Sequence, residues 1–151
     1  NSLAVDANGR VYVGAVGEIG YLQPDAEGQM RYVSLLDRMS VADRQFAEVW
    51  STFDTPQGVV FSSAQQLMQL QGERVQSWKP HSGLGVALGA NDRAFVVEVG
   101  RGLLELIGGE WRLVAGGERF ANDAVLAILS VPPQWLAGPG TLLVASRARG
   151  L

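Results

Sequence analysis

The chain contains no cysteine and only one histidine among its 151 residues. The lack of cysteine excludes disulfide bonds, thiol catalysis and thiolate metal sites. Charged residues are also scarce, at 18%, and the formal net charge of -3 argues against a nucleic-acid surface, which is typically basic. The longest apolar run, "AVLAILSV" (124–131), is far too short to cross a bilayer.

Apolar residues and glycine are abundant instead, with 47% hydrophobic residues and 19 glycines. This length and hydrophobic content suit one folded domain with a sizeable core. The stretch "NGRVYVGAVGEIGYL" (8–22) combines both features, because apolar residues alternate along it between glycines. The pattern predicts β-strands joined by tight hairpin turns, in which glycine adopts positive φ angles.

Three later stretches repeat this pattern of a polar or glycine start, an apolar run, a short polar turn and a second apolar run. Leu22, Leu70 and Leu106 occupy equivalent places in it. The related stretches are "GRVYVGAVGEIGYL" (9–22), "GVVFSSAQQLMQL" (58–70), "RAFVVEVGRGLLEL" (93–106) and "GTLLVASRARGL" (140–151). Internal similarity at a spacing of about 40–50 residues is typical of β-propeller blades.

Further short apolar segments flank these stretches and complete units of four strands. One segment precedes each stretch, as "VWSTFD" (49–54) does, and one follows each of the first three, as "RVQSWK" (74–79) does. Turn-forming connectors such as "DANG" (6–9) join consecutive strands, which predicts four-stranded antiparallel meanders. The predicted fold is therefore all-β: a β-propeller in the form of an incomplete arc of about three and a half four-stranded antiparallel blades.

The expected blades follow one another along the chain, with one insert. The segment "LLDRMSVADRQFAE" (35–48) is long enough to carry a helical turn with Leu36 and Met39 on one side. We predict blade 1 at about 1–35, the insert at 36–48, blade 2 at about 49–80, blade 3 at about 83–115 and a partial blade 4 at about 124–151.

An open arc leaves two apolar blade faces uncovered, each exposing several hundred square ångströms, which is more than a soluble monomer usually tolerates. The chain also begins at Asn1 without an initiating methionine, and Leu151 ends it early in a repeat. We therefore expect a piece of a longer protein, with the remaining propeller blades or a second copy of the chain as partners.

The stretch "DANGRVYVGAVGEIGYL" (6–22) resembles the repeat of two-component-regulator propellers. That repeat has an aspartate, two variable residues, a glycine, an apolar–aromatic–apolar triplet and a further glycine. Here Asp6, Gly9, Val11-Tyr12-Val13 and Gly14 fill these positions, and "GRGLLEL" (100–106) fits the Gly-Leu half of the repeat. Blade 2 departs from the pattern at three positions, Ser62, Gln66 and Met68.

This resemblance implies the periplasmic, extracytoplasmic part of a bacterial inner-membrane signal-transduction protein, which senses an unknown small molecule or protein signal. It also implies that this segment is not itself an enzyme. An output domain, such as a histidine kinase or a diguanylate cyclase, is then expected elsewhere in the full-length protein. We expect no cofactor, no metal ion and no nucleic acid among its partners.

The turns between second and third strands lie at the same edge of a meander as the connectors between blades. We therefore expect one face of the arc to gather candidate ligand-binding residues, with an aromatic ring just below the rim. Arginines there suit carboxylate or phosphate groups, although turn residues are polar by default. The candidates are Trp50, Glu18, His81, Arg101, Arg147 and Arg149.

Two other functions stay open at this point. A carbohydrate-active propeller enzyme needs two carboxylates flanking a glycosidic bond, but Asp6 and Asp54 fall in hairpin turns, where aspartate favours backbone hydrogen bonds. A protein-interaction scaffold needs an exposed contact, for which Trp135 in a long loop is a candidate toward a neighbouring domain. No catalytic residue is predicted, since the chain has one histidine and no "GxSxG" motif.

Overall fold

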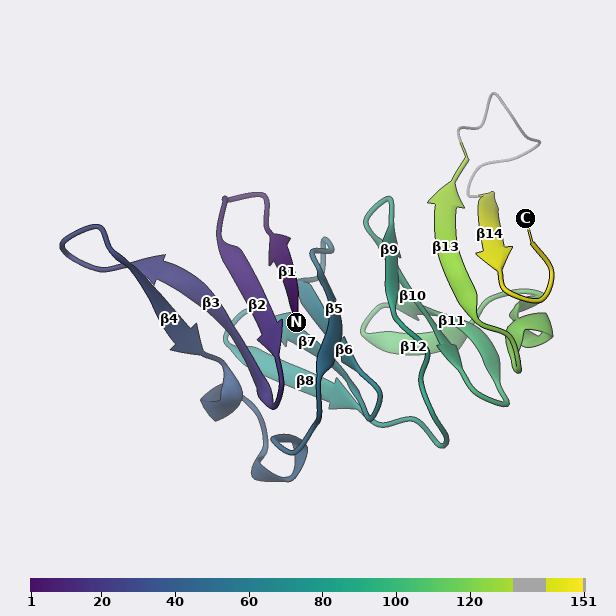
Figure 1. The fold of residues 1–151 in the computed structure, drawn as a ribbon, viewed down its shortest axis with the longest axis horizontal. Coiled ribbons are helices and arrows are strands. Elements are labelled where there is room, and N and C mark those ends of the chain that lie inside the picture. Colours follow the sequence, from purple (N-terminus) through teal and green to yellow (C-terminus); the bar gives the residue numbers. More distant parts are fainter. Residues whose placement is uncertain (132–140, 151) are drawn as a thin grey trace.

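The computed structural model describes residues 1–131 and 141–150, and Figure 1 shows the course of the chain. Every strand pairs in an antiparallel sheet, and the helices among the described residues are short 3-10 helices. None of these helices is long and apolar enough to pass through a membrane. Trp135, the candidate contact to a neighbouring domain, lies outside the described residues.

Consecutive strands pair into four separate sheets, which Figure 1 shows side by side in chain order. Sheet 1 contains β1 (Ser2–Val5), β2 (Val11–Ala15), β3 (Glu18–Pro24) and β4 (Met30–Ser34). Sheet 2 contains β5 (Val49–Phe53), β6 (Val59–Ser63), β7 (Leu67–Gln71) and β8 (Arg74–Trp78). Sheet 3 contains β9 (Leu88–Ala90), β10 (Arg93–Glu98), β11 (Gly102–Ile107) and β12 (Glu110–Leu113). Sheet 4 contains β13 (Val125–Ser130) and β14 (Leu142–Ser146). The prediction of an all-β fold built from separate antiparallel sheets is confirmed.

The turn between β1 and β2 explains three residues of the repeat. The Oδ1 atom of Asp6 accepts hydrogen bonds from the backbone N–H groups of Asn8 and Arg10, each at 2.9 Å. Gly9 has a φ of 81°, a conformation that favours glycine. Gly14 is needed for another reason, because a Cβ atom there would collide with side chains of β5. The repeat therefore specifies both a turn and a close approach between sheets.

Each middle sheet is apolar on both faces, because successive side chains along a strand point in opposite directions. On β6, Phe61 packs against sheet 1 while Val60 packs against sheet 3. On β10, Val96 contacts sheet 2 and Phe95 contacts sheet 4. All four side chains are almost completely buried. Hydrophobic contact between sheets therefore holds the described part of the chain together.

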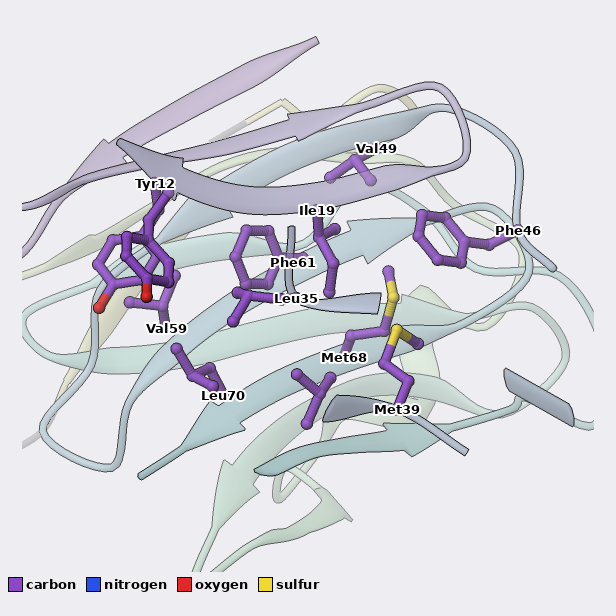
Figure 2. Close-up of a cluster of buried hydrophobic side chains, with 12 residues drawn as sticks. Tyr12, Ile19, Leu35, Met39, Phe46, Val49, Val59, Phe61, Met68 and Leu70 are labelled. Carbon is purple, nitrogen blue, oxygen red and sulfur yellow. The ribbon is translucent and has the colours of Figure 1, made fainter. Parts of the chain in front are cut away.

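The insert between sheets 1 and 2 is part of this packing. It forms the 3-10 helices η1 (Leu36–Arg38) and η2 (Val41–Asp43), so the predicted helical turn is present. Leu35, Met39 and Phe46 are buried in one cluster with side chains of β2, β3, β6 and β7, as Figure 2 shows. The insert thus fills the seam between two sheets rather than forming a separate loop.

The first strands of successive sheets lie next to one another. β1 contacts β5, β5 contacts β9, and β9 contacts β13. In each four-stranded sheet, the fourth strand lies at the opposite edge. The sheets are therefore arranged with their first strands on a common side.

Two sheet faces have no neighbouring sheet among the described residues. Leu22 is half-buried on the outer face of sheet 1, whereas the equivalent Leu70 and Leu106 are buried against the preceding sheet. On the same face Val5 is 59% exposed, and on the outer face of sheet 4 Leu129, opposite Leu143, is 59% exposed. The repeat thus places similar residues on every sheet, but their burial depends on whether a neighbour is present.

Replacing Phe61 by alanine tests the hydrophobic seam between sheets 1 and 2. Phe61 has no exposed surface, so Phe61→Ala should lower the free energy of unfolding by about 3–5 kcal/mol. Urea denaturation followed by tryptophan fluorescence measures this change. The matched control is Val41→Ala, at a position 79% exposed in the insert, for which we expect a change within about 0.5 kcal/mol. Equal effects of the two substitutions would contradict the packing described here.

Candidate functional site

Four of the six candidate residues line two cavities. His81 and Arg101 line a cavity of about 320 Å3 between sheets 2 and 3, which we call the inter-sheet pocket. Trp50 and Arg147 line a second cavity of about 670 Å3 beside sheets 3 and 4, which we call the rim pocket. Leu84, in the segment that joins sheets 2 and 3, lines both cavities.

The topology explains how distant residues meet in the inter-sheet pocket. Strand β8 ends at Trp78, and the connector that follows leads toward the end of β10 at Glu98. The short turn after β10 then brings Arg101 to the same edge. The lining residues are Leu67, Trp78, Lys79, Pro80, His81, Leu84, Glu98, Arg101, Leu104, Glu110 and Trp111.

Glu98 organises the charged end of this pocket. One carboxylate oxygen, Oε1, accepts a hydrogen bond of 2.7 Å from the backbone N–H of His81, and Oε2 accepts one of 3.0 Å from Nη1 of Arg101. Burial alone raises the pKa of Glu98, but these hydrogen bonds and the charge of Arg101 outweigh it and hold the pKa below its ordinary value. Glu98 is therefore an ionised, buried anchor for both residues.

Two tryptophans form the aromatic end of the pocket. The rings of Trp78 and Trp111 meet edge to face, with centroids 6.4 Å apart and an interplanar angle of 88°. Both rings also pack on the apolar core between sheets 2 and 3. The Nε1 atom of Trp111 is buried and has no hydrogen-bond partner among the described residues. A buried donor without a partner lowers the stability of the fold.

Lys79, in the connector that forms part of the pocket wall, bonds to residues of the insert. Its ammonium group donates to the carbonyl oxygen of Ala42 at 3.0 Å and lies 2.8 Å from Oδ1 of Asp43. The hydrogen bond from Lys79 also lowers the pKa of Asp43 below its ordinary value. The connector between sheets 2 and 3 is thus fixed to the element that fills the seam between sheets 1 and 2.

The rim pocket is wider and more apolar. Trp50 is 42% exposed at its wall. Asp123 lines the pocket and accepts hydrogen bonds from the Ser146 hydroxyl at 2.7 Å and from the backbone N–H of Ala148 at 3.0 Å. These hydrogen bonds, the one from Ser146 above all, lower the pKa of Asp123. Asp123 therefore fixes the turn that carries Arg147.

The other two candidates lie apart from these cavities. Oε1 of Glu18 accepts hydrogen bonds from the Ser34 hydroxyl at 2.8 Å and from the backbone N–H of Ile19 at 3.1 Å, both within sheet 1. Arg149 is held by its backbone N–H, which donates to Ser146 Oγ at 3.3 Å. The structure thus brings the predicted residues together as two pairs, not as one cluster.

The anchors Glu98 and Asp123 were missed by reasoning from the sequence. Glu98 has a recognisable signal, because an acid that ends an apolar strand and precedes an arginine by three residues forms an ion pair across the turn. Asp123 has no such signal, because its partner Ser146 comes from a strand 23 residues further along the chain. Contacts between distant segments decide which turn residues share a pocket.

Comparison with known protein families, curated proteins and solved structures finds no match for this chain. The resemblance to two-component-regulator propellers therefore depends on the repeat residues in the sequence. Asp6, Gly9 and Gly14 of that repeat all have structural duties in sheet 1. These structural roles explain why the repeat forms its fold, but they do not identify a function. The function of the chain is therefore argued from the pockets.

Replacing Glu98 by glutamine tests its role as the anchor of the inter-sheet pocket. Glu98→Gln removes a buried charge that accepts from two partners, so the free energy of unfolding at pH 7 should fall by about 1–3 kcal/mol. Glu110→Gln is the matched control, because Glu110 is exposed and its ion pair with Arg112 lies at the surface. Denaturation of the three proteins at pH 7 measures the difference.

The pH dependence of stability gives a second measurement of the same anchor. The folded-state pKa of Glu98 is below its unfolded value, so the unfolded chain binds more protons between the two values. The contribution of Glu98 is present above the unfolded pKa, near pH 4.3, and is lost as the pH falls through the folded value. Glu98→Gln should therefore flatten the acid limb of the stability curve. An unchanged acid limb would contradict the ionised anchor.

Proposed function

We propose that the chain is an arc of a β-propeller and serves as the ligand-sensing part of the periplasmic region of a bacterial signal-transduction protein. The contacts between the first strands of successive sheets support the propeller, since the inner strands of blades adjoin in this way around a central axis. The repeat that resembles two-component-regulator propellers supports the signalling role and the periplasmic location. An output domain elsewhere in the full-length protein then carries the kinase or cyclase activity.

The observation that carries the non-catalytic role is the hydrogen bonding of the two anchoring carboxylates, Glu98 and Asp123. Hydrogen-bond donors hold the pKa values of Glu98 and Asp123 below their ordinary range. A glycosidase instead needs one carboxyl group with a raised pKa that donates a proton to the leaving group. The arrangement therefore favours binding over the alternative of a carbohydrate-active propeller enzyme. A protein-interaction scaffold is the second alternative.

Sensing needs a ligand that binds two states of the protein with different affinity. The inter-sheet pocket has walls from both sheet 2 and sheet 3. A ligand in this pocket therefore contacts two sheets at once, and its affinity depends on their relative position. Ligand binding at such a site favours one relative position of the two sheets over others. A sensor requires this coupling between binding and conformation.

The uncovered faces of sheets 1 and 4 support a further part of the proposal. Positions equivalent to Leu22 are buried in sheets 2 and 3 by a preceding sheet. We propose that the remaining propeller blades or a second copy of the chain cover these faces in the same manner. An added sheet then buries apolar surface worth about 25 cal/mol per Å2.

Association of the chain tests the second-copy arrangement. We expect analytical ultracentrifugation over a concentration series to show dimers or larger species, because Val5 and Leu129 expose apolar surface. Leu129→Asp should shift the equilibrium toward the monomer, since a charge then enters the contact. Val41→Asp, at an exposed position in the insert, is the matched control. Association that Leu129→Asp leaves unchanged would contradict this use of sheet 4, and a monomer throughout would exclude the second copy.

A paired screen tests sensing against catalysis. Thermal denaturation in the presence of a broad panel of small molecules should reveal compounds that raise the melting temperature, since a ligand that binds only the folded state stabilises it. We expect no turnover of chromogenic glycosides by the same sample. Glycoside hydrolysis that disappears in Glu98→Gln would overturn the proposal and establish the carbohydrate-active enzyme instead.

A further inference from the structure

We propose that the inter-sheet pocket binds a small organic carboxylate with a flat apolar body. In this arrangement Arg101 receives the carboxylate, and Trp78 and Trp111 contact the body. The inference rests on the proposed sensing function and names the class of ligand for one of its two pockets.

The acidic groups at the pocket are already paired within the protein. Both oxygens of Glu98 accept hydrogen bonds, one from the backbone N–H of His81 and the other from Arg101. The carboxylate of Glu110 is engaged by Arg112 at 2.9 Å. These acids therefore position their partners and offer little to a ligand that donates hydrogen bonds.

The two cationic side chains at the pocket keep unpaired donors. Arg101 uses only Nη1 toward Glu98, and its Nε and Nη2 atoms have no partner in the part of the chain that the structure describes. The ammonium group of Lys79 has three N–H donors, and its two recorded contacts leave one free. A ligand that satisfies this pocket must therefore bring acceptors.

The geometry of Arg101 selects the kind of acceptor. The Nε–Nη2 edge of a guanidinium group matches the two oxygens of a carboxylate and forms two parallel hydrogen bonds with them. Glu98 lies on the other side of the guanidinium and offsets part of its charge. A singly charged carboxylate therefore suits this position better than a doubly charged phosphate monoester.

The size and walls of the pocket select the rest of the ligand. A volume of about 320 Å3 lies at the lower end of the range for small-molecule sites, so one or two rings fill it. Opposite the charged end, Trp78, Trp111 and Leu104 present apolar and aromatic surface. A flat ring contacts such surface over a large area with little loss of conformational entropy. An aromatic carboxylate meets both requirements.

Isothermal titration of the chain with benzoate, phenylacetate and indole-3-acetate tests this inference. Each carboxylate is compared with its neutral primary amide, which has nearly the same shape and no charge. We expect saturable binding of at least one carboxylate with one site per chain. Its amide should bind at least about tenfold more weakly, because it cannot form the charged pair with Arg101.

Variants at three positions locate the site. Arg101→Gln should weaken carboxylate binding by about tenfold or more. The affinity of Arg101→Lys should lie between that of Arg101→Gln and that of the natural chain, because lysine keeps the charge but lacks two parallel N–H donors. Trp111→Leu keeps an apolar side chain and removes the flat ring from the wall, so it should weaken binding severalfold. Arg74→Gln is the matched control on an exposed arginine of β8 that lines neither cavity, with no change expected. Urea denaturation of each variant confirms that it folds.

Three results would overturn the inference. These are equal affinities for carboxylate and amide, unchanged carboxylate affinity in Arg101→Gln and Trp111→Leu, or no saturable binding of any of the three carboxylates up to about 10 mM. If the thermal screen still finds other ligands in these cases, the sensing function stands and only the ligand class is wrong. If the screen also finds none, the sensing function fails with it.

Discussion

Each middle sheet of this protein is buried on both faces, so successive residues of one strand serve two different hydrophobic interfaces. Val60 and Phe61 show the consequence: neighbours in sequence, they belong to separate clusters on opposite sides of sheet 2. An apolar sheet face must be buried against another layer. The sheets are therefore stable only in the stacked arrangement, and the turns at their edges take their positions from it.

The pockets follow from that stacking. Because the sheets meet face to face along the strands, gaps open where the strands end, and the connectors and turns pass there. Glu98, at the end of β10, shows how a charge is accommodated at such a point, since backbone and guanidinium donors compensate for its burial. The inter-sheet pocket thus joins an apolar wall, which is the edge of a core cluster, to a charged end held by one anchor.

Much of the fold is readable from the sequence, because alternation with a period of two and turn residues such as Asp6 and Gly9 act locally. The separate antiparallel sheets and the helical turn in the insert follow from such local rules. The site is less readable. His81 and Arg101 meet because of the packing between sheets 2 and 3, while Glu18 stays within sheet 1 with Ser34. Which turn lies opposite which is a property of the stacked sheets and has no local signature.

The order of the sheets along the chain also determines which part of the protein unfolds locally most easily. Among the described strands, the main contacts between sheets join neighbours along the chain, so stability is close to a sum over successive seams. Sheet 2 packs against a neighbouring sheet on both faces and also contacts the insert. Sheet 4 has two described strands and packs against sheet 3 on one face. The backbone amide hydrogens of sheet 4 therefore exchange for solvent deuterium after the smallest local opening of the structure. Those of β6 exchange only when sheet 2 loses its packing against both neighbouring sheets.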